Sequence, residues 1–136
     1  MEISLVPRER LNETWGEITP ILERATKISG GRFSNISVLD ELLNDRISLW
    51  VVLHEKKILA VFTVRIVNYV ERRSLYVELL AGSRFKEWME EMFIKMRGWG
   101  QVHKCTHIEC GGRRGWVKLG QKYGFKVAYT VIEREI

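Results

Sequence analysis

The chain has 136 residues and a mass of 16.0 kDa, which fits a single domain over residues 1–136 and leaves too little chain for two well-buried cores. Hydrophobic residues make up 46% and charged residues 29%, a balance that excludes a disordered chain. Lys and Arg number 22 against 17 Asp and Glu, and residues 69–136 hold the whole surplus, with 13 basic and 8 acidic side chains. This bias favours an anionic partner, either a phosphate-bearing small molecule or nucleic acid, with ordinary surface charge as the alternative.

The expected compartment follows from what the sequence lacks. No apolar stretch approaches the roughly 20 residues of a membrane helix, and residues 1–6 have neither the basic nor the apolar region of a secretory signal. Two cysteines, Cys105 and Cys110, make no disulfide framework, and their spacing of five fits neither a local disulfide nor a redox pair. We therefore expect a cytoplasmic protein with reduced cysteines.

The first third of the chain predicts a strand and two helices. A short strand is expected over residues 2–6. Apolar residues recur at helical spacing over residues 12–28, and Pro20 marks a point where this helix kinks or splits. A shorter helix is expected over residues 38–43, with Ser37 as its cap.

The middle of the chain predicts an antiparallel meander and a third helix. Residues 47–54, 58–67 and 75–80 are rich in β-branched and aromatic side chains and are separated by polar turns. Apolar residues then line one face of a helix over residues 84–97, and Gly98-Trp99-Gly100 is expected to end it.

The last third predicts a strand over residues 103–110, a helix over residues 114–123 and a final strand over residues 125–132. The complete order is strand, helix, helix, three strands, helix, strand, helix, strand. Three antiparallel strands followed by strand–helix–strand units predict one mixed α/β sheet covered by helices.

This order of elements resembles the fold of the Gcn5-related N-acetyltransferases (GNAT). Residues 113–125, RRGWVKLGQKYGF, are similar to the last helix of that family, which ends in Gly-Phe before the final strand. The Gly-Gly-Arg-Arg-Gly-Trp, helix, Gly-Phe pattern also resembles small acetyltransferase-like proteins of tailed bacteriophages, often encoded among virion genes. The resemblance implies transfer of an acyl group from acetyl-CoA to an amine. The alternative is a non-catalytic pseudoenzyme that binds other proteins, for instance as a virion component.

The resemblance also implies where acyl-CoA would bind. In the family it lies in a gap between the third meander strand and the next parallel strand, with its pyrophosphate on the N–H groups that open the following helix. Such N–H groups lack partners and the helix dipole favours anions. Gly82 would allow the tight turn, Ser83 would cap the helix, and Arg84 and Lys86 would face phosphate. The implied binding residues are Leu79, Leu80, Ala81, Gly82, Ser83, Arg84, Lys86, Arg113 and Arg114.

Glu78 is the implied general base, because it lies on the strand that would flank the acyl donor. A buried carboxylate has a raised pKa, the useful direction for accepting a proton from an ammonium group. The alternative is a solvent-facing carboxylate on a strand whose buried face consists of Leu75, Val77 and Leu79.

Several positions depart from the family pattern. The family's phosphate loop reads Gln/Arg-x-x-Gly-x-Gly/Ala, whereas this chain has one glycine there and the bulky Phe85 close by. The tyrosine that protonates the leaving thiolate falls at Gly120, and the usual asparagine falls near Arg113. Trp116 replaces a small residue. These departures favour the non-catalytic alternative.

Two further groups of residues carry weaker predictions. His103, Cys105, His107 and Glu109 alternate along one predicted strand and are all zinc-compatible. Same-face neighbours on a strand are about 6.6 Å apart, too far for three of them to hold one ion, so no metal is expected. Arg113 and Arg114 form a basic helix edge with Lys118 and Lys122, which suits a coenzyme phosphate, an acidic protein, nucleic acid or plain solvent. No nucleic-acid-binding signature is present, so nucleic acid is not expected.

Overall fold

The computed structural model describes all 136 residues. Its strands are β1 (Glu2–Leu5), β2 (Ser48–His54), β3 (Lys57–Asn68), β4 (Arg73–Gly82) and β5 (His107–Cys110), and its helices are α1 (Leu11–Thr26), α2 (Asn35–Leu43), α3 (Phe85–Val102) and α4 (Gly115–Gln121). A 3-10 turn, η1 (Arg8–Arg10), precedes α1. None of the helices combines the length and the apolar character needed to span a bilayer.

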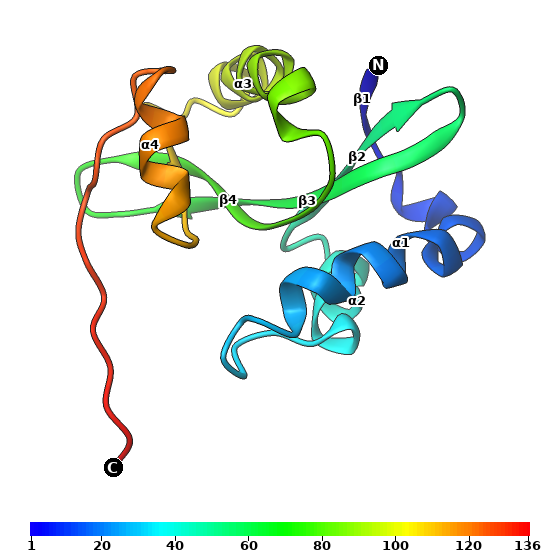
Figure 1. The fold of residues 1–136 in the computed structure, drawn as a ribbon, viewed down its shortest axis with the longest axis horizontal. Coiled ribbons are helices and arrows are strands. Elements are labelled where there is room, and N and C mark those ends of the chain that lie inside the picture. The colour runs from blue at the N-terminus through cyan, green and yellow to red at the C-terminus, as the bar shows by residue number, and fades with distance from the viewer.

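The five strands form one mixed sheet in the order β1-β2-β3-β4-β5. The first four are antiparallel neighbours, and β5 is parallel to β4. Helices α1 and α2 cover one face, and α3 covers the other (Figure 1). The predicted mixed sheet is therefore confirmed, except for its last strand.

Two apolar cores lie on the two faces of this sheet. On the α1–α2 face, Ile18 and Leu22 of α1 pack against strand residues such as Val61. On the α3 face, the fully buried Trp88 packs against Phe62 and other strand residues. Each burial removes a large apolar side chain from water, worth about 1.5–3 kcal/mol apiece.

Several predicted boundaries were wrong. Helix α1 continues through Pro20 without a break. Helix α2 begins at Asn35, because Ser34 caps it and exchanges bonds with Ser37 in a capping box. Helix α3 continues through Gly98 and Gly100 to Val102. Gly100 is buried, and a β-carbon on it would lie 3.6 Å from the Leu75 side chain, so this glycine lies within the packed helix–sheet interface rather than at the helix end.

The predicted strand over residues 125–132 is absent. After the Phe125 N–H donates to the Gly120 carbonyl, no residue to Ile136 makes a backbone hydrogen bond. A strand forms only when its backbone groups find a partner, and this segment, although its side chains suit a strand, has none within one chain.

Candidate functional site

Strands β4 and β5 separate part-way along their length. They pair from Ser74 with His107 to Val77 with Cys110, and β4 then continues to Gly82 without a partner on that side. The chain after Cys110 forms no strand, and helix α4 follows. This confirms the predicted arrangement of two neighbouring strands that diverge. It leaves the β5-facing backbone of β4, from Glu78 onwards, free of strand pairing.

A β-bulge lies at the point of divergence. On β3, the neighbours Thr63 and Val64 pair with Leu79 and Val77 of β4, so Glu78 is the extra residue. The bulge reverses the alternation of side chains: Val77 faces the α3 core, whereas Leu79 faces the α1–α2 core. The prediction that Leu75, Val77 and Leu79 share one buried face was therefore wrong.

Glu78 is held by a guanidinium group. Nε and Nη2 of Arg65 on β3 lie 3.1 and 3.2 Å from the two carboxylate oxygens of Glu78, whose side chain is only 16% exposed. The same Nη2 donates to Oε2 of Glu41 on α2 at 3.0 Å, and Arg46 contacts the other Glu41 oxygen.

The charges in this cluster reinforce one another. The hydrogen bonds to Glu78, and less strongly to Glu41, raise the pKa of Arg65. Arg46 and then Arg65 lower the pKa of Glu41. Glu78 thus faces the α1–α2 side and is paired with the Arg65 guanidinium through both of its oxygens.

The turn between β4 and α3 is tightly bound to β3. Gly82 has φ +143°, and a β-carbon on it would overlap Ala60 and the Leu59 carbonyl oxygen. The Ser83 N–H donates to that carbonyl at 3.1 Å, and the Ser83 carbonyl accepts from Nε1 of Trp88 at 2.9 Å. Gly82 is therefore required by the fold itself. The prediction that Ser83 caps the helix was wrong, because Arg84 is the N-cap residue and no side chain caps the helix.

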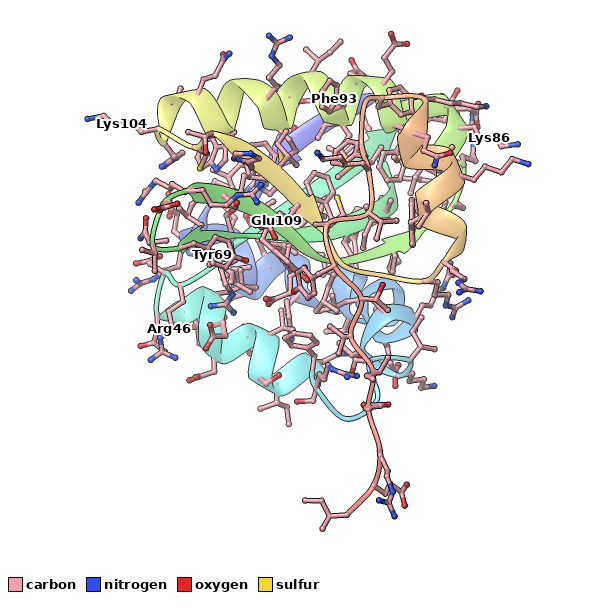
Figure 2. The ribbon with its side chains drawn as sticks, turned by 90° about the vertical axis from the view of Figure 1, so that its left-hand side faces the viewer. Arg46, Tyr69, Lys86, Phe93, Lys104 and Glu109 are labelled. Atoms are coloured by element: carbon pink, nitrogen blue, oxygen red, sulfur yellow. The ribbon has the colours of Figure 1, made fainter.

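The charged side chains of this turn are only partly free for a ligand. Arg84 is the residue before α3, in the left-handed region at φ +59°, and its Nη2 donates to Oε1 of Glu87 at 2.8 Å. This hydrogen bond raises the pKa of Arg84 and lowers that of Glu87. Lys86 is exposed and extends into solvent (Figure 2). Glu87 therefore places a negative charge in the helical turn where a pyrophosphate was expected.

Aromatic side chains join the starts of α3 and α4. The Phe85 ring lies 5.1 Å from that of Trp88 and 5.2 Å, nearly perpendicular, from that of Trp116 on α4. Trp116 also covers Gly112, where a β-carbon would overlap its ring. Arg113 and Arg114 are exposed just before α4. The Phe85–Trp116 contact spans the space between the two helix starts, beside the predicted slot.

A cluster of phenols and carboxylates at the divergence was missed by sequence reasoning. Tyr76 on β4 pairs with Glu109 on β5, and the Tyr76 hydroxyl lies where a β-carbon on Gly111 would be. The Tyr69 hydroxyl donates to Oε1 of Glu109 at 3.3 Å, and the two side chains lie side by side in Figure 2. The other oxygen of Glu109, Oε2, is buried without a partner.

The surroundings raise the pKa of both phenols. Desolvation, followed by the nearby Tyr129 and Glu78, raises the pKa of Tyr76. Desolvation and Glu109 raise the pKa of Tyr69. The sequence signal was weak, because only the register between β4 and β5 reveals that Tyr76 and Glu109 are neighbours.

The four zinc-compatible residues do not share a strand. His103 follows the last turn of α3 and Cys105 precedes β5, so only His107 and Glu109 lie on it. No group of three or more His, Cys, Asp or Glu side chains converges in a way that would hold a metal ion. Cys110 ends β5, and burial of its thiol raises its pKa to about 11, although part of the residue is exposed.

Comparison with solved structures identifies the fold. A ribosomal-protein-alanine N-acetyltransferase from Brucella melitensis biovar Abortus 2308 superimposes with a TM-score of 0.73 at 10% identity, covering 100% of both chains. The aminoglycoside N-acetyltransferase AAC(6')-Iy in complex with CoA gives 0.70 at 15% identity, covering 99% of this chain and 93% of that one. The fold is that of the GNAT acetyltransferases.

An aminoglycoside acetyltransferase from an uncultured soil metagenomic sample, in complex with sisomicin, gives a TM-score of 0.70 at 11% identity and covers 99% of this chain and 94% of that one. No protein-family model matches the sequence, and no curated protein matches it. The likeness to the acetyltransferases is thus one of GNAT architecture, present over the whole chain at identities of 9–15%.

Proposed function

We propose that this protein binds acyl-CoA between β4 and β5 and transfers the acyl group to an amine. The observation that carries the proposal is the divergence of the two strands after Val77 and Cys110, beside the start of α3. Backbone amides exposed by such a divergence can pair with the amides of an extended ligand. The similarity of the whole fold to solved acetyltransferases, one of them bound to CoA, supports this function.

The binding residues in this proposal come from two elements. The β4 backbone from Leu79 to Ala81 holds the pantetheine and the thioester. The turn from Gly82 to Lys86, together with Arg113 and Arg114, receives the phosphates, with Lys86, Arg113 and Arg114 as the exposed cations without ion-pair partners. The ligand reaches β4 only when the Phe85–Trp116 contact opens, so a bound coenzyme displaces Trp116.

Glu78 and Tyr76 carry the proton transfers. The amine nitrogen attacks the thioester carbonyl carbon, the C–N bond forms and the C–S bond breaks. The ammonium proton passes to Glu78, after Arg65 has released one carboxylate oxygen, and the thiolate takes the phenol proton of Tyr76. In this scheme Tyr76 takes the place of the missing tyrosine at position 120, because its hydroxyl lies at the divergence, next to Gly111.

A second candidate function, a non-catalytic module that binds other proteins, for instance in a virion, is favoured by specific contacts. Arg65 donates hydrogen bonds to both oxygens of Glu78, and Arg84 donates to Glu87. The rings of Phe85 and Trp116 are in contact between the starts of α3 and α4. A chain that had lost its ligand would keep such contacts because they stabilise the empty fold.

Calorimetric titration with acetyl-CoA separates the two functions. We expect binding by the wild-type chain and, at a hundredfold excess over Kd, a gain of about 2.7 kcal/mol in the free energy of unfolding. Arg113→Ala/Arg114→Ala should weaken binding about tenfold by removing phosphate contacts. Lys95→Ala, an exposed cation on α3 away from the slot, is the matched control.

Each result of the acetyl-CoA experiment supports a different function. Binding followed by acylation of an amine supports the transferase, and binding without turnover over a panel of amines supports a coenzyme-binding protein that lacks catalysis. If saturating acetyl-CoA produces no heat and no shift of the melting curve, the acyltransferase proposal fails and the protein-binding module remains.

A further inference from the structure

Glu109 on β5 is a half-buried carboxylate without a cation. Its Oε1 accepts a hydrogen bond from the Tyr69 hydroxyl at 3.3 Å, whereas its Oε2 is buried and has no partner. None of the ion pairs of the fold includes Glu109. A buried carboxylate oxygen has lost its hydration, and a hydrogen-bond donor or a cation normally compensates for this loss. Glu109 therefore retains the capacity to bind a positively charged donor.

A second buried group without a partner lies on the same face of the sheet. Ser74 on β4 is 0% exposed, and its Oγ has no hydrogen-bond partner. Its neighbour Leu75 packs in the α3 core, so the alternation of side chains directs Ser74 toward the α1–α2 face. Tyr76 pairs with Glu109 in the register of the two strands, so Ser74, two residues before Tyr76, is a diagonal neighbour of Glu109. Two unpartnered buried polar atoms at neighbouring positions indicate a ligand that supplies donors to both.

The chemistry of this pair of residues suits an alkylammonium group. No group of three or more His, Cys, Asp or Glu side chains converges in a way that would hold a metal ion. An ammonium group carries three N–H donors, enough for a carboxylate oxygen and a hydroxyl at once. The phenols of Tyr69 and Tyr76 lie beside the carboxylate, and aromatic rings favour both cations and the methylene groups attached to them.

Glu78 lies on the same face, on the other side of Tyr76. It follows Tyr76 by two residues on β4, whereas Glu109 lies across from Tyr76 on β5. After desolvation and Tyr129, the charges of Glu78 and Glu109 raise the pKa of Tyr76, which places both carboxylates near its hydroxyl. Glu78 differs from Glu109 because Arg65 donates to both of its oxygens. Diagonal neighbours on adjacent strands are about 7–8 Å apart, a distance that a chain of about four carbons can span.

We propose that Glu109 and Ser74 bind the second, non-reacting ammonium group of an acceptor that is a short α,ω-diamine. This assignment rests on the acyl transfer proposed above, because it names the acceptor class of that reaction. The ammonium group donates to Oε2 of Glu109 and to the Ser74 hydroxyl, and the methylene chain passes the Tyr76 ring. The reacting amine then lies near Glu78. Glu109 is thus a specificity-determining residue and takes no part in the proton transfers.

The ligand enters by displacing Tyr69. This side chain lies beside Glu109 in Figure 2, at the start of the turn between β3 and β4, and it is 43% exposed. Its hydrogen bond to Glu109 is 3.3 Å long, whereas O–H to O bonds are typically about 2.7–2.8 Å, so little is lost when it breaks.

Binding without acetyl-CoA is the first test. Titration of the full chain with 1,4-diaminobutane, followed through the backbone amide NMR signals of β4 and β5, gives the Kd of the diamine. The matched ligand is 1-aminopentane, in which a methyl group replaces the second ammonium group. We expect the Kd of the diamine to be lower by about tenfold or more, because hydrogen bonds to a charged group are the stronger ones. Equal Kd values, or no binding of the diamine, overturn the proposal.

Variants assign the preference to the two residues. Glu109→Gln removes the charge and should raise the Kd of the diamine about tenfold without changing that of 1-aminopentane. Glu71→Gln, at an exposed carboxylate in the turn between β3 and β4, is the matched control and should bind the diamine as the wild type does. Ser74→Ala should weaken diamine binding without lowering Tm, because the Ser74 hydroxyl makes no bond in the free protein. A diamine Kd that Glu109→Gln leaves unchanged overturns the proposal.

Turnover separates this assignment from the acyltransferase proposal itself. With acetyl-CoA, kcat/KM should be about tenfold higher for the diamine than for 1-aminopentane, and Glu109→Gln should remove the difference by lowering only the diamine value. Acylation of both amines with equal kcat/KM supports the transferase and overturns the diamine assignment. If acetyl-CoA does not bind and neither amine is acylated, the acyltransferase proposal fails. The Glu109-dependent binding of the diamine then still decides whether Glu109 and Ser74 form a cation site.

Discussion

Arg65 and Glu78 form a two-pronged ion pair across the bulge between β3 and β4, with N–O distances of 3.1 and 3.2 Å. The pair lies on the sheet face covered by α1 and α2, and Glu41 joins it from α2. The carboxylate proposed as the general base is therefore also a structural link between two strands and a helix.

Removing Arg65 should destabilise the fold and uncover Glu78. Arg65→Met leaves a largely buried carboxylate without its donors, which should lower the free energy of unfolding by about 1–2 kcal/mol. Adding Glu78→Gln should recover part of this loss. Urea unfolding of both single variants and the double variant measures the coupling. Strictly additive losses would show that the pair contributes nothing.

Acid should weaken the Glu41 contacts. Because Arg46 and Arg65 lower the folded-state pKa of Glu41 below its ordinary 4.5, its contribution is complete above that pH and is lost as pH falls through the lower folded value. Thermal unfolding from about pH 7 to about pH 3 should therefore show a fall in Tm that begins below about pH 4.5. The variant Glu41→Gln should have a smaller acid-induced fall, and an identical fall in both proteins would contradict this assignment.

The Tyr76 hydroxyl should clash with any side chain at position 111. Gly111→Ala places a methyl group where that hydroxyl lies, and the cost should be about 1 kcal/mol because the tip of a half-exposed ring can shift. Tyr76→Phe removes the hydroxyl, so Gly111→Ala should cost less in a Tyr76→Phe background. Chemical unfolding of the four proteins tests this. In the proposed reaction, Tyr76→Phe should also lower kcat by 10²–10⁴-fold with little change in acetyl-CoA affinity.

Cys110 should react slowly with alkylating reagents. Its pKa of about 11, against the ordinary 9.0, leaves about a hundredfold less thiolate at pH 8. Iodoacetamide labelling followed by peptide mapping should show Cys110 modified about tenfold more slowly in the folded chain than in urea, because the thiolate of a thiol with a higher pKa is the stronger nucleophile. Equal rates in the two states would mean that the thiol is not desolvated.

Trp88 should stabilise the turn that begins α3. Trp88→Phe removes the bond from Nε1 to the Ser83 carbonyl and leaves a cavity in the α3 core, with an expected loss of about 1–3 kcal/mol. Amides from Gly82 to Phe85 should then exchange faster, whereas those of α1 should not. Trp99→Phe, a half-buried tryptophan near the other end of α3, is the control.

The sequence predicted most of the sheet, but it did not predict the side-chain contacts where β4 and β5 separate. Hydrophobic periodicity predicted the β2–β3–β4 meander and the helices. Burial of one strand face or one helix face places apolar residues at a regular spacing in the sequence. The partner of Glu78 was not predictable, since Arg65 is thirteen residues away and only the strand register places it there.

The errors have a physical cause as well. Gly100 reads as a helix stop, yet α3 continues through it to Val102, and residues 125–132 read as a strand although no backbone group beyond Phe125 finds a hydrogen-bond partner. Local sequence reports propensity, whereas these outcomes depend on tertiary contacts.

The bulge at Glu78 determines which face of the sheet each side chain of β4 points to. Because one extra residue switches the strand from one core to the other, inserting or deleting a residue between Leu75 and Ala81 would turn apolar side chains out of both cores at once. Replacing Glu78 itself leaves that pattern of side-chain directions intact. Substitution of Glu78 therefore tests the carboxylate alone, whereas a change in the length of the strand would disturb both cores.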